Sequence, residues 1–178
     1  MGLLEIQQGN RTCVRPITTR SIHDPLVSFT KASLSNFIKV FEVRKYLEVG
    51  SAALAAERAT RQEIDRLGEI VQEMEQDLKR NRLGAKTDFD FHATITEATH
   101  NEAYNHIMHT IHDLLQEEMR IAWGSIFRKK DKRKKLFDQH KKLYQAIRQH
   151  DSEKSAEEAL VHLSFAEQNF REGLKVKK

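Results

Sequence analysis

The stretch Thr60–Leu78, TRQEIDRLGEIVQEMEQDL, decides the fold class. Thr60 and Glu63 have the spacing of a capping box, in which each side chain bonds the backbone N–H of the other residue at a helix start. Apolar residues then recur every three or four positions, as on one face of an amphipathic helix: Ile64, Leu67, Ile70, Val71, Met74 and Leu78. The stretch therefore predicts a helix that packs its apolar stripe against other helices.

The helical period continues on both sides of this stretch. Both prolines lie before residue 30, and after residue 90 the only glycines are Gly124 and Gly173, so long helices can form. Further helices are predicted to begin near Ser33, at an N-cap Thr87, at Glu102, in the basic run after Phe127 and at an N-cap Ser152, the last ending near Gly173. We therefore predict an all-α fold, an antiparallel bundle of about six or seven helices.

The N-terminus has a different pattern. Leu4–Gln7 alternates in polarity, Gly9–Asn10 is a turn signal, and Thr12–Val14 is β-prone. These features predict a short β-hairpin. The expected organisation is a hairpin over residues 1–16, a linker over 17–32 and a helical domain over 33–178.

Composition limits the class of protein. A chain of 178 residues with 39% hydrophobic and 31% charged residues is suited to one globular domain with a small appendage. No apolar run approaches the roughly 20 residues that span a bilayer, and the N-terminus has no signal-peptide pattern. A lone Cys13 cannot form an internal disulfide, so a cytoplasmic location is expected.

The net charge of +4 is concentrated in a basic run, Arg128–Lys135. One interpretation is contact with nucleic acid or another acidic surface. The other is a solvated loop and helix start, which we favour because no aromatic residue interleaves the run apart from Phe127 at its edge.

Four polar side chains are predicted to face the interior of the bundle. Asp88 and His92 are four residues apart and lie at the edge of one apolar stripe. His140 lies in the middle of another stripe, and His162 shares a helix face with Phe165. Three histidines and one carboxylate therefore point inward from three helices.

Two explanations of this set remain open from the pattern alone. Each buried polar side chain without a partner costs about 1–3 kcal/mol, so the four either hydrogen-bond within the core or bind a divalent metal such as zinc, nickel, manganese or iron. In a second histidine row on the helix from Glu102, His106 and His109 lie roughly opposite the apolar stripe and His112 lies at its flank, and all three are expected to face solvent or a second subunit.

Several stretches together resemble the C-terminal sensing domain of the FadR subgroup of GntR transcription regulators. They are FEVRKYLE at 41–48, ALAAERAT at 53–60, DFDFH at 88–92 and HKKLYQAI at 140–147, continued by Asp151, Ala156 and His162–Leu163. Their order and helical placement match over roughly residues 25 to 174.

The resemblance implies a metal-binding effector sensor. It implies a divalent metal, zinc first, held by Asp88, His92, His140 and His162. It also implies a small carboxylate effector, a hydroxy acid or a sugar acid. Arg44 is implied as a contact to the effector, with a salt bridge to Glu48 or Glu42 as the alternative role. The further candidates for the pocket wall are Arg120, Trp123 and Tyr144.

Residues 3–16 resemble the wing of the family's winged helix-turn-helix. Arg11 stands where the family usually has a second glycine, and it is the candidate DNA contact in the wing. The recognition helix that would precede the wing is absent, which suggests a fragment, a misplaced start or a truncated gene. We therefore expect operator DNA to be bound only through an upstream domain of the full protein, as a homodimer.

Two other functions remain as alternatives. A metal-dependent hydrolase would need a general base near the metal. No inward carboxylate besides Asp88 stands out from the pattern, and Asp90 points away. We therefore predict that the chain is not an enzyme. A metal-free helical interaction domain, in which the four polar groups bond one another, is the other alternative.

Overall fold

The fold is described from a computed structural model of the chain. The structure describes residues 4–7, 11–14, 26–30, 32–81, 84–126 and 129–175, with side chains left out at 4–7, 11–14, 34, 116–126 and 173–175. The elements are β1 Leu4–Gln7, β2 Arg11–Val14, α2 Leu34–Arg58, α3 Arg61–Lys79, α4 Ala85–Glu97, α5 Glu102–Ile126, α6 Lys130–Arg148 and α7 Ser152–Lys175. The all-α class predicted from the sequence is confirmed.

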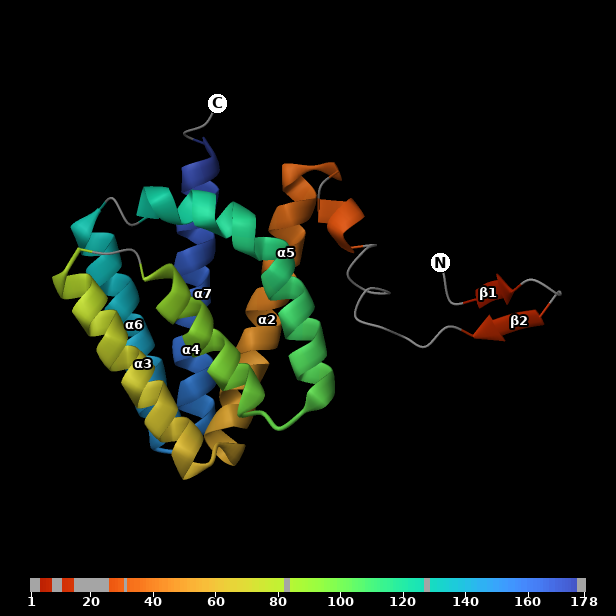
Figure 1. Cartoon of the computed structure of the whole chain (residues 1–178). Coiled ribbons are helices and arrows are strands. Elements are labelled where there is room, and N and C mark those ends of the chain that lie inside the picture. Colours follow the sequence, from red (N-terminus) through yellow and green to blue (C-terminus); the bar gives the residue numbers. More distant parts are fainter. Residues whose placement is uncertain are drawn as a thin grey trace.

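The helices form one bundle, and strands β1 and β2 form an antiparallel pair at the N-terminus (Figure 1). Helix α7 packs along α2 and α6, α3 packs on α6 and α4, and α4 also contacts α2 and α5. Helix α4 is therefore bordered by α2, α3 and α5. None of the helices in the described ranges is both long and apolar enough to cross a membrane.

Two apolar clusters hold the bundle together. The larger one joins α2, α3, α4, α6 and α7 around Leu67, Ile70, Phe91 and Ile147. The smaller one joins α2, α5 and α7, where the rings of Phe41 and Phe170 stack with centroids 5.7 Å apart. Between the two clusters, α2 carries the buried polar residues Arg44, Glu48 and Ser51.

The predicted start of α3 is confirmed. The Thr60 hydroxyl accepts from the backbone N–H of Glu63, and the Glu63 carboxylate accepts from the N–H of Thr60 at 2.7 Å. The stripe behind the capping box is buried from Ile64 to Met74. Ser33 likewise caps α2, since its side chain accepts from the N–H of Asn36.

Two predicted caps were wrong. Helix α4 begins at Ala85 with Gly84 at its N-cap, and the Thr87 hydroxyl, inside the first turn, donates back to the carbonyl of Gly84 at 2.9 Å. At the start of α7, the Asp151 carboxylate accepts from the N–H of Lys154 at 2.8 Å, whereas Ser152 donates to Glu57. In each case another residue occupies the N-cap position, Gly84 without a side-chain cap and Asp151 with one, and the predicted side chain has another partner.

Candidate metal centre

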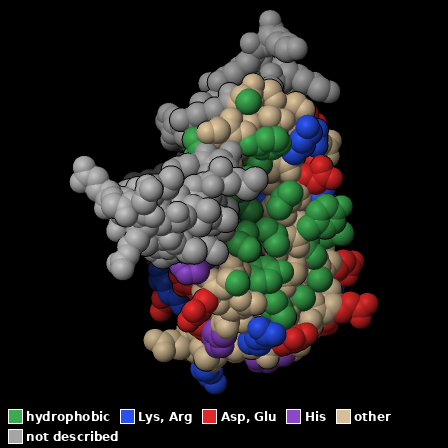
Figure 2. All heavy atoms as spheres, turned by 90° about the vertical axis from the view of Figure 1, so that its right-hand side faces the viewer, with side chains coloured by type: hydrophobic (Ala, Val, Ile, Leu, Met, Phe, Trp, Pro, Cys, Tyr) green, Lys and Arg blue, Asp and Glu red, His purple; other side chains and the backbone are tan. Residues whose placement is uncertain are grey.

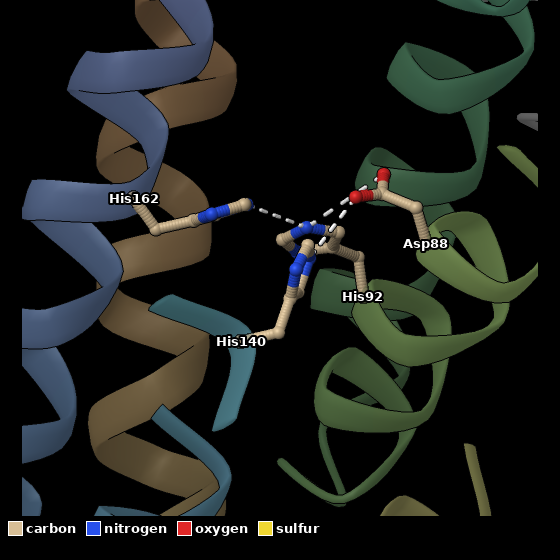
Figure 3. Close-up of side chains that lie close together, drawn as sticks. All are labelled: Asp88, His92, His140 and His162. Carbon is tan, nitrogen blue, oxygen red and sulfur yellow. Dashed lines mark hydrogen bonds and ion pairs between the residues drawn. The ribbon is translucent and has the colours of Figure 1, made fainter. Parts of the chain in front are cut away.

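Three helices bring the four predicted ligands together. Asp88 and His92 come from α4, His140 from α6 and His162 from α7. One ligand atom from each lies within 4.8 Å of the others, and all four side chains are buried. Figure 3 shows the carboxylate and the three imidazole rings pointing toward one common point. The inward orientation predicted from helical periodicity is therefore observed for each residue.

His140 presents one defined nitrogen to the centre. Its Nδ1 lies 3.0 Å from the carbonyl oxygen of Leu136, one turn earlier on α6. A carbonyl only accepts, so Nδ1 carries the proton and a neutral ring has its lone pair on Nε2. That Nε2 lies 3.0 Å from Asp88 Oδ1. Two acceptors face each other at this distance, which requires a proton or a cation near both.

His92 is oriented in the same way. Its Nδ1 lies 2.5 Å from Glu48 Oε2, so the proton of a neutral ring is on Nδ1. Its Nε2 lies 3.1 Å from Nε2 of His162 and 3.9 Å from Asp88 Oδ2. The lone pair of His92 thus points to the same place as the lone pair of His140.

His162 completes the centre from the far side. Burial is the main cause that holds its pKa well below the usual value for histidine, so the ring is neutral. Its Nδ1 is buried without a hydrogen-bond partner among the described residues. A neutral imidazole is the form that binds metal ions.

This donor set fits a divalent cation. Three imidazole nitrogens and one carboxylate converge in a buried interior, where unpaired acceptors are costly. A cation at the common point would satisfy all of them at once, and this donor set suits zinc and its neighbours in the first transition row. Within the described residues, hydrogen bonds leave Nε2 of His140 unsatisfied.

Glu48 lies behind His92, and the sequence analysis missed it as an inward carboxylate. It is 4% exposed and receives the Arg44 guanidinium, Nδ1 of His92 and, at 3.1 Å, Nε2 of His112. Burial alone raises the pKa of Glu48, but Arg44, His92 and His112 together hold it well below the usual value. Glu48 is therefore a carboxylate anion. The signal was present in the sequence, because Phe37, Phe41, Arg44 and Glu48 recur at helical spacing on α2.

The histidine row on α5 divides into two environments. His106 and His109 are exposed, as predicted. The expectation that His112 faces solvent or a second subunit was wrong, because it is 6% exposed and bonded to Glu48. Burial lowers its pKa. His112 stands at the edge of the α5 stripe, and the close approach of α2 encloses it.

The candidate effector contacts lie in different environments. Arg44 is buried and makes the alternative salt bridge to Glu48. Its partner Glu48 also contacts Nδ1 of His92, so Arg44 lies close to the centre. Tyr144 is partly buried and packs against the larger apolar cluster. The side chains of Arg120, Trp123 and Arg11 lie outside the described residues, although their backbones belong to α5 and β2.

A cleft leads to the centre between α3, α4 and α6. We call it the α3–α4–α6 cleft, and about 40 Å³ of it is accessible to the centre of a water molecule. Two of the four candidate ligands, Asp88 and His140, are part of its lining. A second, smaller pocket borders Glu48, Ser51 and His92 on the other side. A small molecule in the larger cleft would therefore reach the candidate ligands directly.

Comparison with known proteins identifies relatives over most of the chain. The FCD domain family matches residues 39–165. The HTH-type transcriptional regulator LutR of Bacillus subtilis is 32% identical over 170 residues, which cover 94% of this chain and 77% of LutR. The Glc operon transcriptional activator of Escherichia coli is 22% identical, covering 96% of this chain and 69% of the activator. The HTH-type transcriptional repressor NanR of the same species is 28% identical, covering 92% and 62%.

Solved structures show the same fold. A GntR protein of Streptococcus agalactiae superposes with a TM-score of 0.67 at 19% identity, covering 93% of this chain and 74% of that one. McbR/YncC of E. coli superposes with a TM-score of 0.65 at 14% identity, covering 99% and 75%. At these identities the likeness concerns the arrangement of the helices.

Proposed function

Because this chain belongs to the FCD domain family of GntR-type transcription regulators, we propose that it senses a small carboxylate through a metal bound by Asp88, His92, His140 and His162. The named relatives are transcription regulators and not enzymes. The convergence of three imidazole Nε2 atoms and one carboxylate in the buried centre carries the proposal.

Zinc is the metal proposed for the site. Zinc takes histidine and carboxylate ligands readily, and nickel, manganese and iron accept the same donors. When bound, the metal supplies a positive charge that attracts an anion. The four residues leave coordination positions open on an ion that takes five or six ligands, and one carboxylate can fill them.

The effector proposed is a hydroxy acid or a sugar acid. The α3–α4–α6 cleft gives it a path to Asp88 and His140. Arg44 is proposed to attract the same carboxylate, since a guanidinium pairs with carboxylates through two parallel hydrogen bonds. Arg44 is 4% exposed, so this attraction acts in an interior of low dielectric.

The carboxylate proposal predicts metal-dependent ligand stabilisation. Glycolate, lactate and gluconate are tested by thermal unfolding of zinc-loaded and zinc-free protein. A ligand at 100 times its Kd stabilises by about 2.7 kcal/mol, which raises Tm by roughly 5–11 °C for a chain of this size. Arg44→Lys is expected to reduce the increment, and Arg148→Lys on the exposed end of α6 serves as the control. Equal increments with and without zinc would contradict a role for the metal.

The hydrolase alternative is not supported by the placement of Glu48. This carboxylate contacts Nδ1 of His92, the nitrogen remote from the centre. A general base must reach the water that it activates, whereas Glu48 is engaged by Arg44, His92 and His112. The metal-free alternative predicts that the purified chain contains no metal.

A homodimer is proposed as the functional assembly. Val43 and Tyr46 on α2 are 53% and 63% exposed, and Ile107 on α5 is 40% exposed. Figure 2 shows apolar side chains gathered on the face of the molecule that lies on the right-hand side of Figure 1, where α5 runs. An apolar face of this kind suits a second copy of the chain. In the full protein, the pairing geometry would set the spacing of two DNA-binding domains.

The dimer proposal predicts a specific effect of charge on α2. Tyr46→Glu is expected to raise the dimer dissociation constant by roughly tenfold or more, because an exposed aromatic residue at an interface often contributes 2 kcal/mol or more. Light scattering over a concentration series measures it. Leu160→Glu, an equally apolar exposed position on α7, should leave the mass unchanged. A monomeric wild-type chain at high concentration would overturn the proposal.

A further inference from the structure

The α3–α4–α6 cleft has polar groups at both of its ends and an apolar middle. Asp88 and His140 belong to the candidate metal centre, whereas Arg133 and Asp77 lie elsewhere along the lining. Between them the walls are Met74, Leu78, Leu136 and Phe137. The cleft therefore suits a molecule with a charged head, a short carbon chain and a second polar end.

Helix geometry fixes how far Arg133 lies from the centre. Arg133 and His140 are seven residues apart on α6, and both line the same cleft. Seven residues make about two helical turns, so their Cα atoms are separated by about 10 Å along the axis on one face. Leu136 and Phe137 occupy the turn between them. An arginine side chain spans part of this distance, and the remaining separation is of the order of the length of a linear molecule of five or six carbons.

Arg133 is distinguished from its neighbours by its partners. Lys132 bonds Glu172 at 2.9 Å, and Lys134 bonds Asp138 at 2.8 Å. Arg133 bonds only neutral oxygens within the described residues, the carbonyl of Asn81 at 3.3 Å and Oδ1 of Asn81 at 2.9 Å. Its Nε is buried and has no hydrogen-bond partner among them. Arg133 is thus part of the cleft lining, and its guanidinium keeps an unused N–H.

We propose that Arg133 binds a second anionic group of the effector, so that the preferred effector is a dicarboxylate with one carboxylate at the metal and the other at Arg133. This inference rests on the proposed function. Asn81 holds two nitrogens of the guanidinium, which orients the side chain for a third hydrogen bond through Nε. Arginine pairs with carboxylates through charge-assisted hydrogen bonds. The basic run Arg128–Lys135 therefore contributes one residue to effector recognition.

Asp77 is expected to weaken dicarboxylate binding, so its substitution should change the affinity in the direction opposite to the loss of Arg133. Its carboxylate is partly exposed and lines the same cleft. A negative charge there repels the distal carboxylate of a dianion and has less effect on a monoanion. Asp77→Asn should therefore strengthen dicarboxylate binding, whereas loss of Arg133 should weaken it.

Matched pairs of compounds test the proposal. Calorimetry with zinc-loaded protein compares 2-hydroxyglutarate with 2-hydroxyvalerate, and 2-hydroxyadipate with 2-hydroxyhexanoate. Each pair has the same carbon chain and differs only in the distal carboxylate. We expect at least one dicarboxylate to bind roughly tenfold more tightly than its partner, since a hydrogen bond to a charged group contributes about 1.5–3 kcal/mol.

Variants of Arg133 distinguish a loss of dicarboxylate preference from a loss of folding. Arg133→Ala should remove the dicarboxylate preference while leaving monocarboxylate and zinc binding intact, and Arg133→Lys should keep part of it. Arg148→Ala removes the same charge from the other end of α6 and should leave the preference unchanged. Equal affinity within both pairs would overturn the role of Arg133 and leave carboxylate sensing standing. Absence of binding by all four compounds would overturn both proposals.

Discussion

His162→Ala is expected to abolish the zinc-dependent stability of the protein. In the wild-type chain, zinc at 1,000 times its Kd stabilises the folded state by about 4.1 kcal/mol, which raises Tm by roughly 8–16 °C at this chain length. His162 supplies one of the four donors and the only one from α7. Without it the centre loses the ligand that links α7 to α4 and α6. The rise in Tm that zinc causes should then fall to nearly zero.

The measurement compares Tm with and without zinc for each variant, so that a change in the stability of the zinc-free protein cancels. His162→Gln, which leaves less empty volume, should lose the increment as well. His106→Ala, on the exposed face of α5, should keep it. Elemental analysis should find about one equivalent of metal in the wild type and in His106→Ala. An undiminished increment in both His162 variants would remove His162 from the centre.

Helical periodicity was sufficient to find the candidate ligands. His140 and His162 lie in apolar stripes, and Asp88 with His92 lies at the edge of another. Successive residues are rotated by about 100° around the helix axis, so the sequence of one helix is enough to tell on which face each side chain lies. Periodicity therefore predicted which side chains turn inward. The resemblance to a known family then grouped them into one site.

The partners behind the ligands depend on distances between helices, which periodicity does not give. Glu48 lies on the stripe of α2 and His112 at the edge of the stripe of α5, yet their contact needs the two helices to approach each other beside α4. The same limit applies to the cleft, because its lining comes from three helices, α3, α4 and α6. The caps at Thr87 and Ser152 failed for a local reason, since neighbouring Gly84 and Asp151 occupy the cap positions.

Glu48 has two separable roles. Its charge compensates Arg44 in the interior, where both side chains are 4% exposed. Its Oε2 also fixes the proton of His92 on Nδ1, which directs Nε2 toward the metal centre. Carboxylates that orient a metal-binding histidine in this way commonly contribute 10- to 100-fold in metal affinity. The first role affects folding stability, and the second affects metal binding.

Glu48→Gln should therefore lower both the folding stability and the zinc affinity of the protein. Removing one partner of a buried ion pair costs about 3–5 kcal/mol, or roughly 6–20 °C in Tm, and zinc affinity should fall about 10- to 100-fold. Glu42→Gln, an exposed change of the same chemistry on α2, should alter neither.

The double variant Arg44→Met, Glu48→Gln distinguishes the two roles. Replacing both members of a buried pair removes the unpaired charge, so most of the lost Tm should return. Zinc affinity should stay low, because no carboxylate then holds Nδ1 of His92. Thermal unfolding of the zinc-free protein and a competitive zinc titration measure the two effects. If zinc affinity returned together with Tm, Glu48 would act only through the stability of the fold, and its role in orienting His92 would be wrong.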